Sequence, residues 1–123
     1  MEQKYIKGDI VMYDNKIHTI MDKLELNNYE LSYIEHPVHQ LELSGVLLTP
    51  EILEKNRWKK MYYDWCHYFP IEGNILYLSK GIGIDGAFSV DVGQDMSYIA
   101  SISFVHQLQH LFFGLGLKSE MEV

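Results

Sequence analysis

Two histidines four residues apart, His106 and His110, come closest to a known chemical signature. Side chains at positions i and i+4 of a helix share one face, and two imidazoles at that spacing can bind one metal ion. In the zincin pattern the first histidine is followed by a glutamate, which activates the zinc-bound water. Here that position is Gln107, whose amide accepts no proton at neutral pH. A metal-dependent enzyme built on His106 and His110 is therefore an alternative function, and we expect no cofactor and no catalytic residues.

A metal site at this pair would need further ligands, and the candidates are distant in the sequence. His36 and His39 flank Pro37-Val38, and His18 and His67 lie elsewhere. Nothing in the sequence brings them to the pair. The two imidazoles are instead expected to face solvent or a partner.

Two other patterns suggest catalysis only superficially. Cys66 directly precedes His67, but neighbouring residues of a strand point to opposite faces and do not form a dyad. The glycines of residues 81–86 partly match a dinucleotide phosphate loop. The alternating residues from Ala87 predict a strand there, so no helix N-terminus is present to hold pyrophosphate. We expect an inert buried thiol and a glycine-rich hairpin loop.

The histidine pair lies on the clearest helix of the sequence. An apolar stripe marks one face of this helix, formed by Phe104, Leu108, Leu111, Phe112 and Leu115. Ser103 is a plausible N-cap, and Gly114 or Gly116 a plausible stop. The stripe is expected to pack on the sheet of the second half of the chain. That packing would leave His106, His110 and Phe113 exposed.

The first 48 residues predict several short antiparallel strands. Turn residues separate alternating segments at residues 10–13, 17–21, 29–33 and 38–43. Such a meander closes into a small SH3-like barrel, because open sheet edges invite aggregation. Thr49-Pro50-Glu51 then predicts a short helix, with Thr49 as the cap and Pro50 at the first helical position.

The second half reads as a short helix, an antiparallel sheet and the closing helix. Extended segments are expected at residues 61–69, 75–78, 87–92 and 98–102. The predicted fold is α+β, one compact domain over residues 1–123 with subdomains 1–48 and 49–123. Aromatic residues suit partner surfaces, and the candidate protein-binding residues are His106, His110, Phe113, Trp58, Tyr62 and Trp65.

Composition limits the classes of partner. The chain has 123 residues with 17 acidic and 10 basic side chains, a net charge of −7, which disfavours binding to phosphate backbones. Lys55, Arg57, Lys59 and Lys60 cluster locally, so a weak nucleic-acid binder stays a further alternative. One cysteine, no signal-like leader and no bilayer-spanning stretch favour the cytoplasm and no membrane partner.

Three stretches carry a resemblance to known sequences: Lys7-Gly8-Asp9, residues 48–56 (LTPEILEKN) and residues 105–110 (VHQLQH). Together they resemble a family of small proteins from phages and mobile elements of gut bacteria. That family often has Asn-Gly-Phe after the short helix, where this chain has Asn56-Arg57-Trp58. The resemblance implies a mobile-element origin and no specific activity. We therefore expect a non-enzymatic module that binds or inhibits a host protein. A homodimer, through an edge strand or the His/Phe face, is an open alternative.

Overall fold

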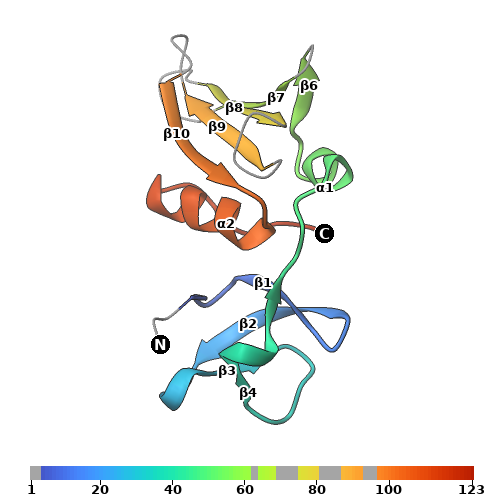
Figure 1. Ribbon diagram of the computed structural model, residues 1–123, viewed down its shortest axis with the longest axis vertical. Coiled ribbons are helices and arrows are strands. Elements are labelled where there is room, and N and C mark those ends of the chain that lie inside the picture. Colours follow the sequence, from blue (N-terminus) through green and yellow to red (C-terminus); the bar gives the residue numbers. More distant parts are fainter. Residues whose placement is uncertain (1–3, 62–63, 69–74, 81–86, 93–96) are drawn as a thin grey trace. The chain divides into compact units, whose positions relative to one another are not determined.

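The computed structural model describes residues 4–61, 64–68, 75–80, 87–92 and 97–123 (Figure 1). The chain divides into two compact units. The first unit contains Met1–Leu47 and Phe104–Met121, and the second contains Leu48–Ser103 and Glu122–Val123. None of the helices in the described ranges has the length and apolar character needed to cross a membrane.

The first unit is a five-stranded antiparallel sheet, curled as a half-barrel, with one helix. Its order is β4-β3-β2-β1-β5. The elements are β1 (Ile10–Tyr13), β2 (Lys16–Lys23), β3 (Asn28–Leu31), β4 (Val38–His39), β5 (Ser44–Gly45) and α2 (Val105–Gly114). Asp14 and Asn15 join β1 to β2 at φ 49° and 61°, the left-handed pair that a two-residue hairpin turn requires. After glycine, aspartate and asparagine tolerate this conformation best, so the sequence favours the turn locally.

A hydrophobic core lies inside the curl of this sheet. Its residues alternate with outward-facing ones along the strands, as a half-buried sheet requires. The core residues are Tyr5, Val11, Ile20, Tyr29, Leu31, Val38 and Leu43.

Two predicted strands end earlier than the sequence suggests. β3 stops at Leu31, and Tyr33 lies beyond it at φ 63° with 97% of its surface exposed. β4 covers only Val38–His39, after which Gln40–Glu42 forms a 3₁₀ turn. Leu41 is consequently exposed and does not share a buried face with Leu43. Alternation of apolar residues cannot separate a strand from a turn when each segment is this short.

The helix α2 begins one residue later than predicted and ends as predicted. The N-cap is Phe104 and not Ser103, and the Phe104 N–H donates to Gln107 Oε1 at 3.0 Å. At the other end Gly116 adopts φ 74°, and the Leu117 N–H donates to the Phe112 carbonyl at 2.9 Å. These bonds form a Schellman motif, which satisfies carbonyls that the helix itself leaves open.

The second unit contains α1 and a second antiparallel sheet of order β10-β9-β8-β7-β6. Its elements are α1 (Pro50–Lys55), β6 (Lys59–Met61), β7 (Asp64–Tyr68), β8 (Ile75–Lys80), β9 (Phe88–Val92) and β10 (Ser97–Ile102). Trp65, Leu78 and Val90 lie opposite one another on adjacent strands, and all three are buried. This row is part of the apolar face of the sheet.

These elements confirm the predicted α+β class, with a curled N-terminal sheet, a short helix, a second antiparallel sheet and a C-terminal helix. The packing of α2 differs from the expectation. The helix belongs to the first unit, where Gln109 bonds Ile10 at the start of β1 and His110 bonds Asp9 just before it. The apolar stripe predicts that α2 packs on a sheet, but it carries no information about which sheet.

The short helix α1 has strong signals at both ends. Thr49 Oγ1 accepts from the Ile52 N–H at 3.3 Å, and Pro50 occupies the first helical position, both as predicted. After the helix Arg57 adopts φ 67°, and the Trp58 N–H donates to the Leu53 carbonyl at 3.0 Å. This is again a Schellman motif, but with arginine at the position that glycine prefers.

We expect Arg57→Gly to raise the free energy of unfolding by up to about 1 kcal/mol, because a left-handed residue with a Cβ costs roughly 1–2 kcal/mol. The measurement is urea denaturation of both proteins. Lys55→Gly, inside the same helix, is the control and is expected to lose about 1 kcal/mol. Equal losses in both variants would contradict the assignment of strain to Arg57.

Candidate functional site

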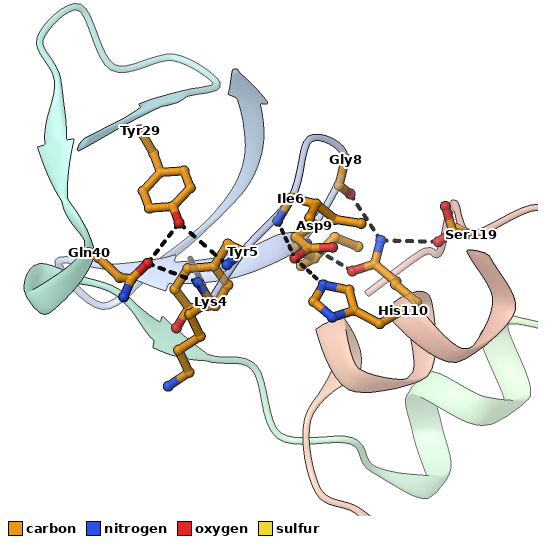
Figure 2. A network of polar contacts seen from close by, with 11 residues as sticks. Lys4, Tyr5, Ile6, Gly8, Asp9, Tyr29, Gln40, His110 and Ser119 are labelled. Carbon is orange, nitrogen blue, oxygen red and sulfur yellow. Dashed lines mark hydrogen bonds and ion pairs between the residues drawn. The ribbon is translucent and has the colours of Figure 1, made fainter. Parts of the chain in front are cut away.

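A carboxylate–imidazole pair joins α2 to the loop before β1 (Figure 2). Asp9 has 1% of its surface exposed, and its Oδ2 lies 2.6 Å from His110 Nε2. The same oxygen accepts from the Ile6 N–H at 2.9 Å. Burial raises the pKa of the Asp9 carboxyl, and the hydrogen bonds from Ile6 and His110 act in the opposite direction. The buried Asp9 carboxyl thus lies beside His110, whose imidazole can compensate a negative charge on it.

Gln109 makes a second connection beside this pair. Its side chain is 2% exposed, and its Oε1 accepts from the Ile10 N–H at 2.9 Å. Its Nε2 donates to the carbonyls of Gly8 at 3.0 Å and Ser119 at 3.1 Å. One amide thus satisfies three backbone groups, two from the segment before and at the start of β1 and one from the segment after α2.

His106 lies inside an aromatic cluster, not on an exposed face. It is 4% exposed, and its ring stacks on Phe104 with centroids 5.7 Å apart. Tyr5 and His110 approach it edge-on at 5.1 Å and 5.7 Å. The prediction that His106 faces solvent is wrong, because the buried face of α2 includes positions 106 and 109 beside Val105, Leu108 and Phe112.

The environment of His106 disfavours the charged imidazolium. Burial, followed by the charges of His110 and Lys4, lowers the pKa of His106 to about 4. Its Nδ1 has no hydrogen-bond partner among the described residues. A neutral imidazole with a buried, unpaired nitrogen is a packing residue that becomes unfavourable when it is protonated.

Gly45 in β5 allows this cluster to form. A Cβ built at Gly45 would lie 2.6 Å from two ring carbons of Phe104 and 3.0 Å from His106 Cε1. Any side chain at this position would displace both rings. The close approach explains why the strand has a glycine here, where glycine otherwise weakens a sheet.

We expect Gly45→Ala to lower the free energy of unfolding by about 1–3 kcal/mol, since added atoms in a packed core force such shifts. Thermal unfolding by circular dichroism measures the loss. The matched control is Gly114→Ala at the end of α2, where an added Cβ meets nothing within 4 Å. That variant is expected to be neutral or more stable by up to about 1 kcal/mol, and a similar loss in both would contradict the clash.

The pair of Asp9 and His110 has the form of a general base, but the described residues supply little else for a reaction. The Asp9 carboxylate accepts a hydrogen bond when His110 Nε2 carries the proton, and Nδ1 is then the nitrogen left to act as a base. No hydroxyl or thiol of a described residue is hydrogen-bonded to His110. No group of three histidine, cysteine, aspartate or glutamate side chains with metal-site geometry is present in the described part of the chain. What the geometry does show is the attachment of α2 to the β1 loop.

A third polar connection holds the N-terminal segment on the curled sheet (Figure 2). Gln40 Oε1 accepts from the Lys4 N–H at 3.0 Å and from the Tyr29 hydroxyl at 2.7 Å. The Tyr5 N–H donates to the same hydroxyl at 3.4 Å. All three connections therefore fix chain segments of the first unit.

The aromatic residues predicted to contact a partner have different surroundings. Trp58 and Trp65 are 3% and 5% exposed, so the expectation that they form a surface is wrong. Trp58 is buried as the residue after the Schellman turn of α1, and Trp65 belongs to the apolar face of the second sheet. His110 is half-buried against Asp9, whereas Phe113 is exposed. Tyr62 lies outside the described residues, as do the glycines of residues 81–86.

A different exposed surface was not predicted from the sequence. It lies on the first unit around Tyr33 and consists of two adjoining hollows of about 340 and 520 Å³. We call it the Tyr33 surface, because Tyr33 and Ile34 line both hollows. The other lining residues are Tyr13, Asp14, Lys16, Ile17 and His18 in one hollow, and Met21, Glu30, Leu31, Ser32 and Glu35 in the other.

Tyr33 has an unfavourable conformation as well as an exposed ring. It follows Ser32 in a turn that the Ile34 N–H closes on the Leu31 carbonyl at 3.4 Å, and its φ is 63°. This is the turn position that glycine prefers, and a bulky residue there is a backbone outlier. Two nearby apolar side chains, Ile17 and Met21, are also about half exposed. An exposed aromatic ring on a strained backbone is a feature that folding alone does not favour.

No protein-family model, curated protein or solved structure matches the chain, so the resemblance to mobile-element proteins stays an expectation.

Proposed function

We propose that this chain is a non-enzymatic protein-interaction module, and that the Tyr33 surface is its contact with the partner. The observation that carries the proposal is Tyr33 itself, 97% exposed in a turn position that disfavours a side chain. Exposed tyrosines with neighbouring apolar residues are typical of contact surfaces. Ile17, Met21 and Ile34 supply those neighbours.

The proposal assigns no reaction to the pair of Asp9 and His110. Both residues use their hydrogen bonds to hold α2 on the β1 loop, and Asp9 is almost completely buried. The sequence resemblance of residues 48–56 and 105–110 adds a mobile-element origin to the proposal, with a host protein in the cytoplasm as the partner. The single cysteine of the chain is in keeping with that compartment.

We expect Tyr33→Gly to leave stability unchanged or raise it by up to about 1 kcal/mol, because glycine relieves the left-handed backbone. The same variant is expected to lose partner binding. A photo-crosslinking residue at position 33, compared with one at position 113, measures the contact in host-like lysate. A discrete crosslinked band from position 33, competed by unlabelled wild type and not by Tyr33→Gly, is the expected result.

The comparison with Phe113 makes this experiment specific. Phe113 is also a large exposed apolar residue of the first unit, at 67%, so general stickiness would crosslink from both positions. Bands that are equal at the two positions, or that Tyr33→Gly competes as well as wild type, would contradict the proposed contact.

A further inference from the structure

The charges around Tyr33 are mostly negative. Asp14 lines the first hollow, and Glu30 and Glu35 line the second. Lys16 is the one lysine or arginine on either lining, and His18 also lines the first hollow. The whole chain is acidic as well, with a net charge of −7. The field at this surface therefore attracts cations and repels carboxylates.

The aromatic residues at the same place can bind a cation directly. Tyr33 is 97% exposed, so its ring is free to lie against a ligand. Tyr13 lines the adjoining hollow, and its ring is held edge-on by His18 at 6.0 Å and His36 at 6.4 Å. A guanidinium group stacks on such rings and can bond carboxylates in its own plane at the same time.

We propose that the Tyr33 surface binds an arginine side chain of its protein partner, with the guanidinium on the Tyr33 ring and the carboxylates of Asp14 and Glu35 as counter-charges. This inference rests on the proposed function and specifies the chemistry of the partner. Arginine fits better than lysine, because its planar group can stack and form two parallel hydrogen bonds to a carboxylate. An acidic partner segment would meet three carboxylates against one ammonium group.

The test is a selection of random twelve-residue peptides on the full immobilised chain, with counter-selection on Tyr33→Gly. We expect the retained peptides to contain arginine. Replacing that arginine by citrulline, which keeps the shape and removes the charge, is expected to weaken binding about tenfold, and replacement by lysine less. Asp14→Asn and Glu35→Gln are expected to weaken the arginine peptide several-fold and the citrulline peptide little. Asparagine tolerates the left-handed backbone of position 14 (φ 49°), so the first variant is expected to fold.

The outcomes separate this inference from the proposed function. Retained peptides that depend on Tyr33 but contain no basic residue would overturn the arginine inference and leave the contact surface in place. Equal binding of the arginine and citrulline peptides would do the same. If no peptide distinguishes wild type from Tyr33→Gly, both the inference and the proposed contact are wrong.

Discussion

Replacing Gln109 by methionine is expected to lower the free energy of unfolding by about 3–5 kcal/mol, because each buried polar group without a partner costs about 1–3 kcal/mol. The side chain is 2% exposed and serves the Ile10 N–H and the carbonyls of Gly8 and Ser119. Methionine has nearly the same length and is apolar, so the loss of hydrogen bonds dominates over any cavity. The same change removes the hydrogen bond between α2 and the first residue of β1, Ile10.

Urea denaturation followed by tryptophan fluorescence and by far-ultraviolet circular dichroism measures this loss. The control is Phe113→Ala on the same helix, an exposed side chain whose removal is expected to change stability by less than about 0.5 kcal/mol. A loss below about 1 kcal/mol in Gln109→Met would mean that water satisfies these backbone groups equally well. The role assigned to Gln109 in attaching α2 would then be wrong.

The parts of the fold that the sequence predicts well are those with local causes. The hairpin after β1 follows from Asp14-Asn15, because these residues tolerate the left-handed conformation that the turn needs. The start of α1 follows from Thr49-Pro50, where the hydroxyl and the fixed φ of proline act within one turn of the chain. In each case the physical cause and the signal lie within four residues of each other.

The candidate site was not predictable in this way, since its contacts join distant segments. Asp9 and His110 are 101 residues apart, and Lys7-Gly8-Asp9 reads only as the opening of a strand. Polar residues between apolar ones on a helix are normally solvent-facing, yet His106 and Gln109 are buried. The role of Gln109 has no local signal, because the backbone groups that it bonds belong to segments that only the fold brings to it.

Tyr33 illustrates the opposite case, in which a sequence rule and the structure disagree locally. Alternation of Tyr29, Leu31 and Tyr33 predicts one continuous strand, and the first two are indeed buried on the same face. The chain turns at Ser32 instead and leaves Tyr33 exposed at φ 63°. A departure from a local sequence rule is expected at a residue that serves binding and not folding. This is why the proposed contact is built on Tyr33 and not on the aromatic residues of the second unit.

Acidification is expected to destabilise the protein through His106 by about 3 kcal/mol between pH 7 and pH 4, because each unit of pKa difference is worth about 1.4 kcal/mol. The pKa of His106 is lowered from 6.5 to about 4 in the folded chain. Between these two values the unfolded chain binds a proton that the folded chain does not. The contribution of His106 is therefore fully present above pH 6.5, falls as the pH decreases, and is lost near pH 4.

His106→Phe tests this assignment, because phenylalanine keeps a ring against Phe104 and Tyr5 but has no proton to bind. The free energy of unfolding, measured by urea denaturation at several pH values from 7 to 4.5, is expected to fall less steeply in the variant. The comparison uses the slope of the unfolding free energy against pH, so a packing cost of the larger ring that is the same at every pH cancels. If that cost prevents folding, His106→Leu replaces His106→Phe. The pKa of Asp9 is raised, so its contribution to stability grows as the pH falls, and it does so in both proteins. Phe113→Ala, which removes an exposed side chain and no titratable group, is expected to keep the wild-type slope. Parallel curves for wild type and His106→Phe would show that burial of His106 does not couple folding to pH, and that its imidazole reaches solvent when it is protonated.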